Sequence, residues 1–393
     1  MNCSREQGRR SEGLIMRVLR IFTFVLMALF FINHQLEADA VKIQFHAWGG
    51  DPRINRYIAA EAEAFKKLMG IEVQHIKIDD LPPVIKKVQS DKASGNLTKG
   101  TIDVVWLNGE NFATMKKSGL LAGPLLSKIE NRKYMNLTDP QFLNDFSTVT
   151  EGFEVPWGRA QFVFIWDRKR TPLAPQTATE LLAYAKANPG RITYVRPPQF
   201  HGTTFLKQLL LELSTSSNLQ KACTPDTTSS ASAPLWKFLD ELHPFLWRKA
   251  QTFPASTQVL HQMLMDQQLL MSMSFNPLEV DGLILKKELP AGAYATTFKK
   301  GGIANVHFLA IPFNSQKQQA ALQWINHLTS PEAQVRKADV ANWGDPTVLD
   351  SAKVPQGIKL PALSLRGPAQ NEPHACWMEY IEREWQRRYG VAG

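Results

Sequence analysis

The side chains best suited to chemistry lie in turns that combine glycine with aromatic and polar residues. Trp48, Gly49 and Gly50 follow a short apolar segment and directly precede Asp51 and Pro52, which together predict a helix start. A glycine pair at this point lets a ligand approach the backbone N–H groups of the helix, which favour anions. The same pair also suits a turn with no ligand, and the sequence leaves both interpretations open.

Two later turns repeat this arrangement. Asn108, Glu110 and Asn111 follow the apolar segment 102–107, where they could orient a polar or cationic solute or only cap the next helix. In the second half of the chain, a glycine turn carries His201, Thr203 and Thr204. Two such turns facing each other across a gap would form a clamp for a small molecule.

Aromatic residues mark three further candidate positions. They stand beside polar residues where the chain is expected to cross between two units, to return, and to turn near its end. Aromatic rings line many ligand pockets, although burial in the core is the commoner fate of a tryptophan. The residues concerned are Trp157 with Arg159, Phe275 with Asn276, and Trp343 with Asp345.

Local catalytic and metal-binding patterns are missing from the sequence. It contains no Gly-x-Ser-x-Gly, His-Glu-x-x-His or P-loop motif, and its nine histidines show no ligand spacing. A hydrolase with a dispersed active site stays an alternative, since triads assemble from distant positions. We expect no catalytic residue, metal or cofactor. Cys223 and Cys376 have no motif spacing, and whether they form a disulfide is left open.

Charge and the N-terminus indicate an exported protein. Arg17 and Arg20 precede a 12-residue apolar run at 21–32, and Ala38 and Ala40 form an A-x-A cleavage site. Together these predict a signal peptide over residues 1–40, because the run is too short to span a bilayer. The net charge of +9 is spread along the chain rather than concentrated in a stripe, so we expect no nucleic-acid partner.

Alternating strand and helix patterns predict two α/β lobes. The strands are expected at 41–45, 71–78, 102–107, 160–166, 191–195, 269–275 and 306–311, with a surface loop at 224–232. The predicted organisation is a signal peptide (1–40), lobe one (41–155), lobe two (156–275), a return to lobe one (276–314), and C-terminal helices mostly in lobe two (315–393).

Several of these segments together resemble the family 1 extracellular solute-binding proteins, and more closely their YnjB-like subgroup. The segments are residues 48–50, 51–56, 106–112, 156–162, 273–277, 330–334 and 343–349. The resemblance implies a type II periplasmic binding protein fold, with two doubly wound lobes, a hinge and a ligand cleft between them. It further implies a monomer that passes a small solute, described in that subgroup as thiamine-related, to an ABC importer permease. An anionic solute is the alternative, since Arg159 and the glycine turns could hold one.

Overall fold

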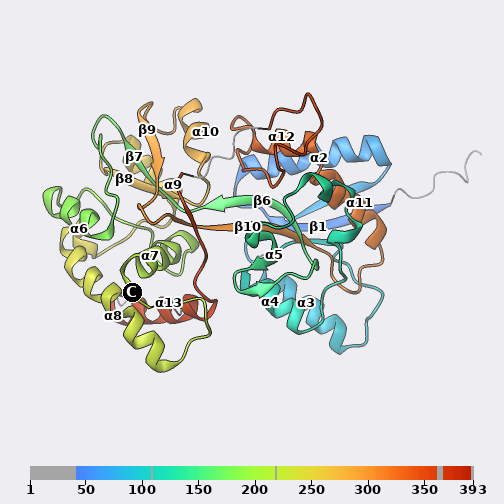
Figure 1. Ribbon diagram of the computed structural model, residues 1–393, viewed down its shortest axis with the longest axis horizontal. Coiled ribbons are helices and arrows are strands. Elements are labelled where there is room, and N and C mark those ends of the chain that lie inside the picture. Colours follow the sequence, from blue (N-terminus) through green and yellow to red (C-terminus); the bar gives the residue numbers. More distant parts are fainter. Residues whose placement is uncertain (1–40, 108, 217–218, 361–365, 391–393) are drawn as a thin grey trace, which may run out of the picture.

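Two lobes joined by a pair of crossing strands make up the protein (Figure 1). The computed structural model describes residues 41–107, 109–216, 219–360 and 366–390. The predicted signal peptide therefore lies outside the described residues. Strands β6 (Val155–Gln161) and β10 (Gly302–Ala310) run antiparallel to each other from one lobe to the other. No helix in the described ranges is both long and apolar enough to cross a membrane.

Lobe one is built on a sheet in which β1 pairs in parallel with both of its neighbours. The order is β11-β10-β3-β1-β2, and β6 extends it beside β10. Helices α2 and α11 pack on one face of the sheet, and α3 and α4 pack on the other. The elements of lobe one are β1 (Lys42–Trp48), α2 (Pro52–Met69), β2 (Glu72–Ile78), α3 (Pro82–Ala93), β3 (Val104–Leu107), α4 (Gly109–Lys117), α5 (Pro140–Leu143), β4 (Asn144–Asp145), β5 (Thr148–Val149), α11 (Gln318–Leu328) and α12 (Pro331–Ala338). The short strand β11 (Ala369–Gln370) pairs with the end of β10 that lies in lobe two.

Local sequence explains why α2 begins and ends where it does. The Asp51 carboxylate accepts a hydrogen bond from the backbone N–H of Arg53, and Pro52 occupies the first turn. Gly70 ends the helix with φ of 68°, a conformation that favours glycine. This capping places the Asp51–Arg53 segment at the carboxyl end of β1, at the edge of the sheet that faces lobe two.

Lobe two surrounds a three-stranded antiparallel sheet of order β8-β7-β9. Its core contains many of the largest buried side chains of the chain. The elements are β7 (Val163–Asp167), α6 (Ala178–Ala187), α7 (Phe200–Leu213), α8 (Pro225–Leu242), α9 (Thr257–Met265), β8 (Met271–Ser274), α10 (Glu279–Leu285), β9 (Ala293–Thr296) and α13 (Cys376–Tyr389). Cys223 and Cys376 form a disulfide that ties the start of α13 to the segment before α8.

The structure corrects several predicted boundaries. Residues 276–314 do not return directly to lobe one, because α10 and β9 remain with lobe two and only β10 crosses back. Of residues 315–393, α11 and α12 pack against α2 in lobe one, whereas α13 packs in lobe two. Residues 191–195 form no strand, and the predicted loop at 224–232 is almost entirely the first half of α8.

Candidate functional site

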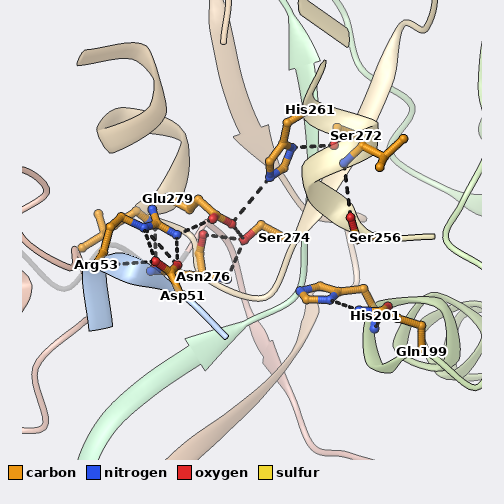
Figure 2. Close-up of polar contacts among 12 residues, drawn as sticks. Asp51, Arg53, Gln199, His201, Ser256, His261, Ser272, Ser274, Asn276 and Glu279 are labelled. Atoms are coloured by element: carbon orange, nitrogen blue, oxygen red, sulfur yellow. Dashed lines mark hydrogen bonds and ion pairs between the residues drawn. The ribbon is translucent and has the colours of Figure 1, made fainter. Parts of the chain in front are cut away.

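An ion-pair cluster joins the two lobes where α2 and α10 begin (Figure 2). The Arg53 guanidinium donates to the Asp51 carboxylate in its own lobe, with Nε 3.0 Å from Oδ2. Its Nη2 also donates to Oε1 of Glu279 in lobe two, at 2.6 Å. All three side chains are largely buried. A charge pair therefore joins the two lobes at this point.

Lobe two holds Glu279 in place through residues at the end of β8 and on α9. The Ser274 hydroxyl donates to Oε2 of Glu279, and Nε2 of His261 lies 3.8 Å from the same oxygen. Asn276 accepts the backbone N–H of Leu278 through Oδ1, which shapes the turn that leads into α10. The Glu279 carboxylate thus has a fixed orientation toward lobe one.

The electrostatics of the cluster favour charged side chains despite their burial. Burial alone would raise the pKa of Glu279, but His261, Arg53 and Ser274 outweigh it and hold the pKa well below its usual range. Burial would likewise lower the pKa of Arg53, yet Asp51 and Glu279 raise it. Two carboxylates therefore meet one guanidinium, and the three groups together carry one net negative charge.

His201 lies beside this cluster at the start of α7. The Gln199 amide donates to its Nδ1 at 3.3 Å. Burial lowers the pKa of His201 to about 4, although Glu279 acts to raise it and His261 to lower it further. The imidazole is therefore neutral near pH 7.

This lowered pKa predicts a loss of stability in mild acid. Below the ordinary value of 6.5 the unfolded chain binds a proton at His201, whereas the folded chain does so only near pH 4. The free energy of unfolding should therefore fall between about pH 6.5 and pH 4, and urea denaturation across this range measures it. His201→Gln should make the decline shallower without abolishing it, because burial lowers the pKa of His46 and His243 to about 4 as well. An unchanged slope in His201→Gln would contradict the assignment.

Two aromatic rings near the cluster remain open to solvent. Trp48, at the end of β1, is 40% exposed, and Phe200, at the start of α7, is 47% exposed. Phe275 is buried and packs edge-on against Phe200 at 5.1 Å between ring centroids. Each lobe thus offers one accessible aromatic face.

The glycine pair beside Trp48 has a steric role. A Cβ at Gly49 would lie 2.5 Å from the Lys77 side chain, and one at Gly50 would lie 2.8 Å from the Trp48 ring. Close approach by neighbouring side chains therefore accounts for both glycines. That a ligand approaches the backbone at these two glycines stays a prediction.

Trp157 does not face the cleft as predicted. It is fully buried in lobe one, with its ring centroid 5.1–6.5 Å from those of Phe45, Tyr57, Trp106 and Trp343. Every residue of β6 is buried, so the strand offers no exposed face to carry an aromatic ring. Trp343, only 4% exposed, belongs to the same aromatic cluster.

Other candidates are engaged in structural contacts. Asp345 is buried between Lys337 Nζ at 2.6 Å and His307 Nε2 at 2.9 Å. Arg159 pairs with Asp139 at 2.5 Å and stacks on the Phe142 ring. Both charged side chains are therefore held in ion pairs within the protein, Asp345 in lobe one and Arg159 on the crossing strand β6.

The remaining candidates lie on α7 and around the start of α4. Thr203 donates to Oε1 of Glu382 at 2.7 Å, and Thr204 donates to the Phe200 carbonyl one turn back. Asn111 is half-buried on α4. Asn108 and the side chain of Glu110 lie outside the described residues.

Sequence reasoning singled out turns that lie beside this ion-pair cluster but missed the side chains that join the lobes. Arg53 follows the glycine pair by three residues, and Glu279 follows Asn276 by three. Each charged residue was therefore within one helical turn of a predicted position. Their pairing across 226 residues has no signal in the sequence.

Comparison with known proteins agrees with this two-lobed architecture. Residues 60–364 match the family described as bacterial extracellular solute-binding protein. Protein YnjB of Escherichia coli is 41% identical over 388 residues, which cover 97% of this chain and 100% of that protein.

Solved structures share the fold at low sequence identity. The substrate-binding protein PotD of a spermidine/putrescine ABC transporter from Streptococcus pneumoniae has a TM-score of 0.62 and 15% identity, covering 89% of this chain and 98% of that one. A putative extracellular solute-binding protein from Bordetella parapertussis has a TM-score of 0.65 and 14% identity, covering 89% and 99%. The expected type II periplasmic binding protein fold is thus confirmed, and the chain belongs to the bacterial extracellular solute-binding proteins, the family that supplies ABC importers with small solutes.

Proposed function

We propose that this protein captures a small cationic solute, thiamine or a thiamine-like compound, in the cleft around Asp51, Arg53 and Glu279. The observation that carries the proposal is the excess of buried carboxylates over guanidinium in that cluster. A cation entering beside two carboxylates and one guanidinium gains more attraction than an anion of the same size.

The exposed aromatic rings also favour a cationic solute. Trp48 and Phe200 offer one aromatic face from each lobe, and a cationic ring is attracted to such faces. Contacts with both lobes would be complete only in the closed state, so a ligand held this way would shift the population toward closure.

An anionic solute is the second candidate, and one observation favours it. Nη1 of Arg53 is buried and has no hydrogen-bond partner among the described residues. An oxyanion could accept a hydrogen bond from this atom.

The proposal extends to the setting of the protein. Residues 1–40 would direct export to the periplasm, and the mature chain would act as a monomer that docks on an ABC permease. It would bind its solute without catalysis and without nucleic acid.

A thermal-shift titration with thiamine, inorganic phosphate and glucose tests the charge of the solute. Thiamine should raise the melting temperature saturably, because a ligand that binds only the folded state stabilises it by RT ln(1 + [L]/Kd). Trp48→Ala should weaken thiamine binding by about tenfold, as expected for about 1–2 kcal/mol of cation–π contact.

Leu173→Ala provides a matched control, since this apolar side chain is 87% exposed and outside the cluster. Its affinity for thiamine should equal that of the unaltered protein. A saturable shift with phosphate alone would favour the anionic candidate. Turnover of a screened compound without any shift would favour an enzyme.

A further inference from the structure

A second cavity lies beside the crossing strands and shares no lining residue with the Asp51–Glu279 cluster. Its volume is about 250 Å³. In Figure 1, α5 and α13 lie on one side of β10, whereas α2 and α10 lie on the other. Lobe one, β10 and lobe two all contribute to the lining, which consists of Pro140, Gln141, Asn144, Asp145, Phe146, Ser147, Gln220, Ala304, Asn305, Val306, Asn371 and Glu372.

Two buried side chains in this lining have polar atoms without partners in the described structure. Asn305, on β10, is 7% exposed, and neither its Nδ2 nor its Oδ1 makes a hydrogen bond. Glu372 is 2% exposed, and its Oε1 is likewise unpartnered. Buried polar atoms nearly always have a hydrogen-bond partner. Each buried donor or acceptor without one lowers the stability of the fold by about 1–3 kcal/mol. The cavity therefore presents one unused donor and two unused acceptors.

The charges around the cavity are already balanced or engaged. Oε2 of Glu372 accepts from Lys207 Nζ at 2.5 Å in an ion pair that is itself buried. Asp145 accepts the backbone N–H of Gly109 at 2.5 Å. The atoms without partners therefore belong to the neutral amide of Asn305 and to the carboxylate of Glu372, whose charge Lys207 balances.

This pattern selects the chemical class of the ligand. An anion would face two acceptors, and an ammonium group would leave the Asn305 donor unused. A hydroxyl group both donates and accepts, and the rest of the lining is rich in amides and hydroxyls: Gln141, Asn144, Ser147, Gln220 and Asn371. The volume is below the 300–1,000 Å³ that is typical of drug-sized ligands, so the occupant must be small.

We propose that this cavity is a second binding site, for a small neutral polyhydroxylated molecule between a triol and a monosaccharide in size. Hydroxyl groups donate to Oδ1 of Asn305 and Oε1 of Glu372 and accept from Nδ2 of Asn305. Because both lobes line the site, its occupant is coupled to lobe closure, and the coupling to solute binding is reciprocal. The inference stands apart from the nature of the solute in the main cleft.

Side-chain amide NMR of the full chain labelled with ¹⁵N-asparagine tests the site with xylitol as the probe. A site-specific signal is needed because polyols stabilise proteins generally by exclusion from their surface. We expect saturable shifts of the Asn144, Asn305 and Asn371 amide signals, each assigned by its loss in the corresponding alanine variant. Asn305→Ala should weaken the response of Asn144 and Asn371 at least tenfold.

Three controls separate the possible results. Asn342→Ala removes an exposed amide outside the cavity and should leave the titration unchanged. Glu279→Gln leaves every lining residue of the cavity in place. The xylitol response should therefore stay saturable, at lower affinity where the lobes open, even if thiamine binding is lost. If Asn305→Ala fails to fold, Asn371→Ala should still weaken the response of Asn144.

Three results would overturn the proposal. One is a non-saturable shift that is uniform over all asparagine amides. Another is saturation by ethylammonium but not by xylitol. The third is a crystal structure of xylitol-soaked protein in which ordered water alone fills the cavity.

Discussion

Replacing Trp157 with alanine should lower the free energy of unfolding by about 3–5 kcal/mol, the usual cost of removing a buried tryptophan. The ring is fully buried, and four other aromatic rings surround it. Their mutual contacts prevent easy collapse of the cavity left behind. Equilibrium denaturation in urea without ligand measures this loss.

Trp48→Ala is the matched control for this prediction. The same side chain is removed, but from a position that is 40% exposed, so the loss of stability should be much smaller. Solute binding should respond in the opposite order, with the greater weakening in Trp48→Ala. The assignment of Trp157 to the core is wrong if Trp157→Ala keeps its stability and loses affinity instead.

These two tryptophans show what a sequence can and cannot predict about a site. Both stand beside a glycine and next to a predicted strand, so their local patterns are nearly the same. What separates them is tertiary: Trp157 lies on a strand that is buried over its whole length, and Trp48 lies on the last residue of β1. A strand that is buried on both faces lacks the alternation of apolar and polar residues from which buried positions are predicted.

Helix α8 shows a different limit. Its serine- and threonine-rich start favours a loop by composition. In the structure Thr224 and Thr227 form a capping box, and the Ser232 hydroxyl donates to the Thr228 carbonyl. Local hydrogen bonds thus satisfy side chains that otherwise compete with the helix. By contrast, the N-terminal cap of α2 is a local signal, and the helix start predicted at Asp51 and Pro52 is confirmed.

Loss of the Glu279 carboxylate is expected to have the other large effect. Glu279→Leu leaves the Arg53 guanidinium buried with Asp51 as its sole remaining ion-pair partner among the described residues. Breaking a buried ion pair by removing one partner typically costs about 3–5 kcal/mol, and we expect a loss at the lower end of this range because Asp51 still compensates Arg53. Chemical denaturation measures the loss. Glu72→Ala, which breaks an ion pair with Lys42 whose side chains are 40% and 47% exposed, is the control and should leave the stability nearly unchanged.

The double variant Arg53→Met with Glu279→Leu distinguishes the pair from the packing of either side chain. Arg53→Met alone leaves the carboxylates of Asp51 and Glu279 without their guanidinium. Adding Glu279→Leu removes one of these two uncompensated charges, so part of the stability lost in Arg53→Met should return. Additive losses in the double variant would show that the two residues act independently and would remove the ion pair as the link between the lobes.

The same variants show whether this link controls closure. Because Arg53 and Glu279 lie on opposite lobes, separating them should allow the lobes of the ligand-free protein to open, and its radius of gyration in X-ray scattering should increase. A cationic solute should bind Glu279→Leu much more weakly, since the cluster would then carry no net charge. Tight cation binding by a variant that has opened would mean that Glu279 holds the lobes together but does not recognise the solute.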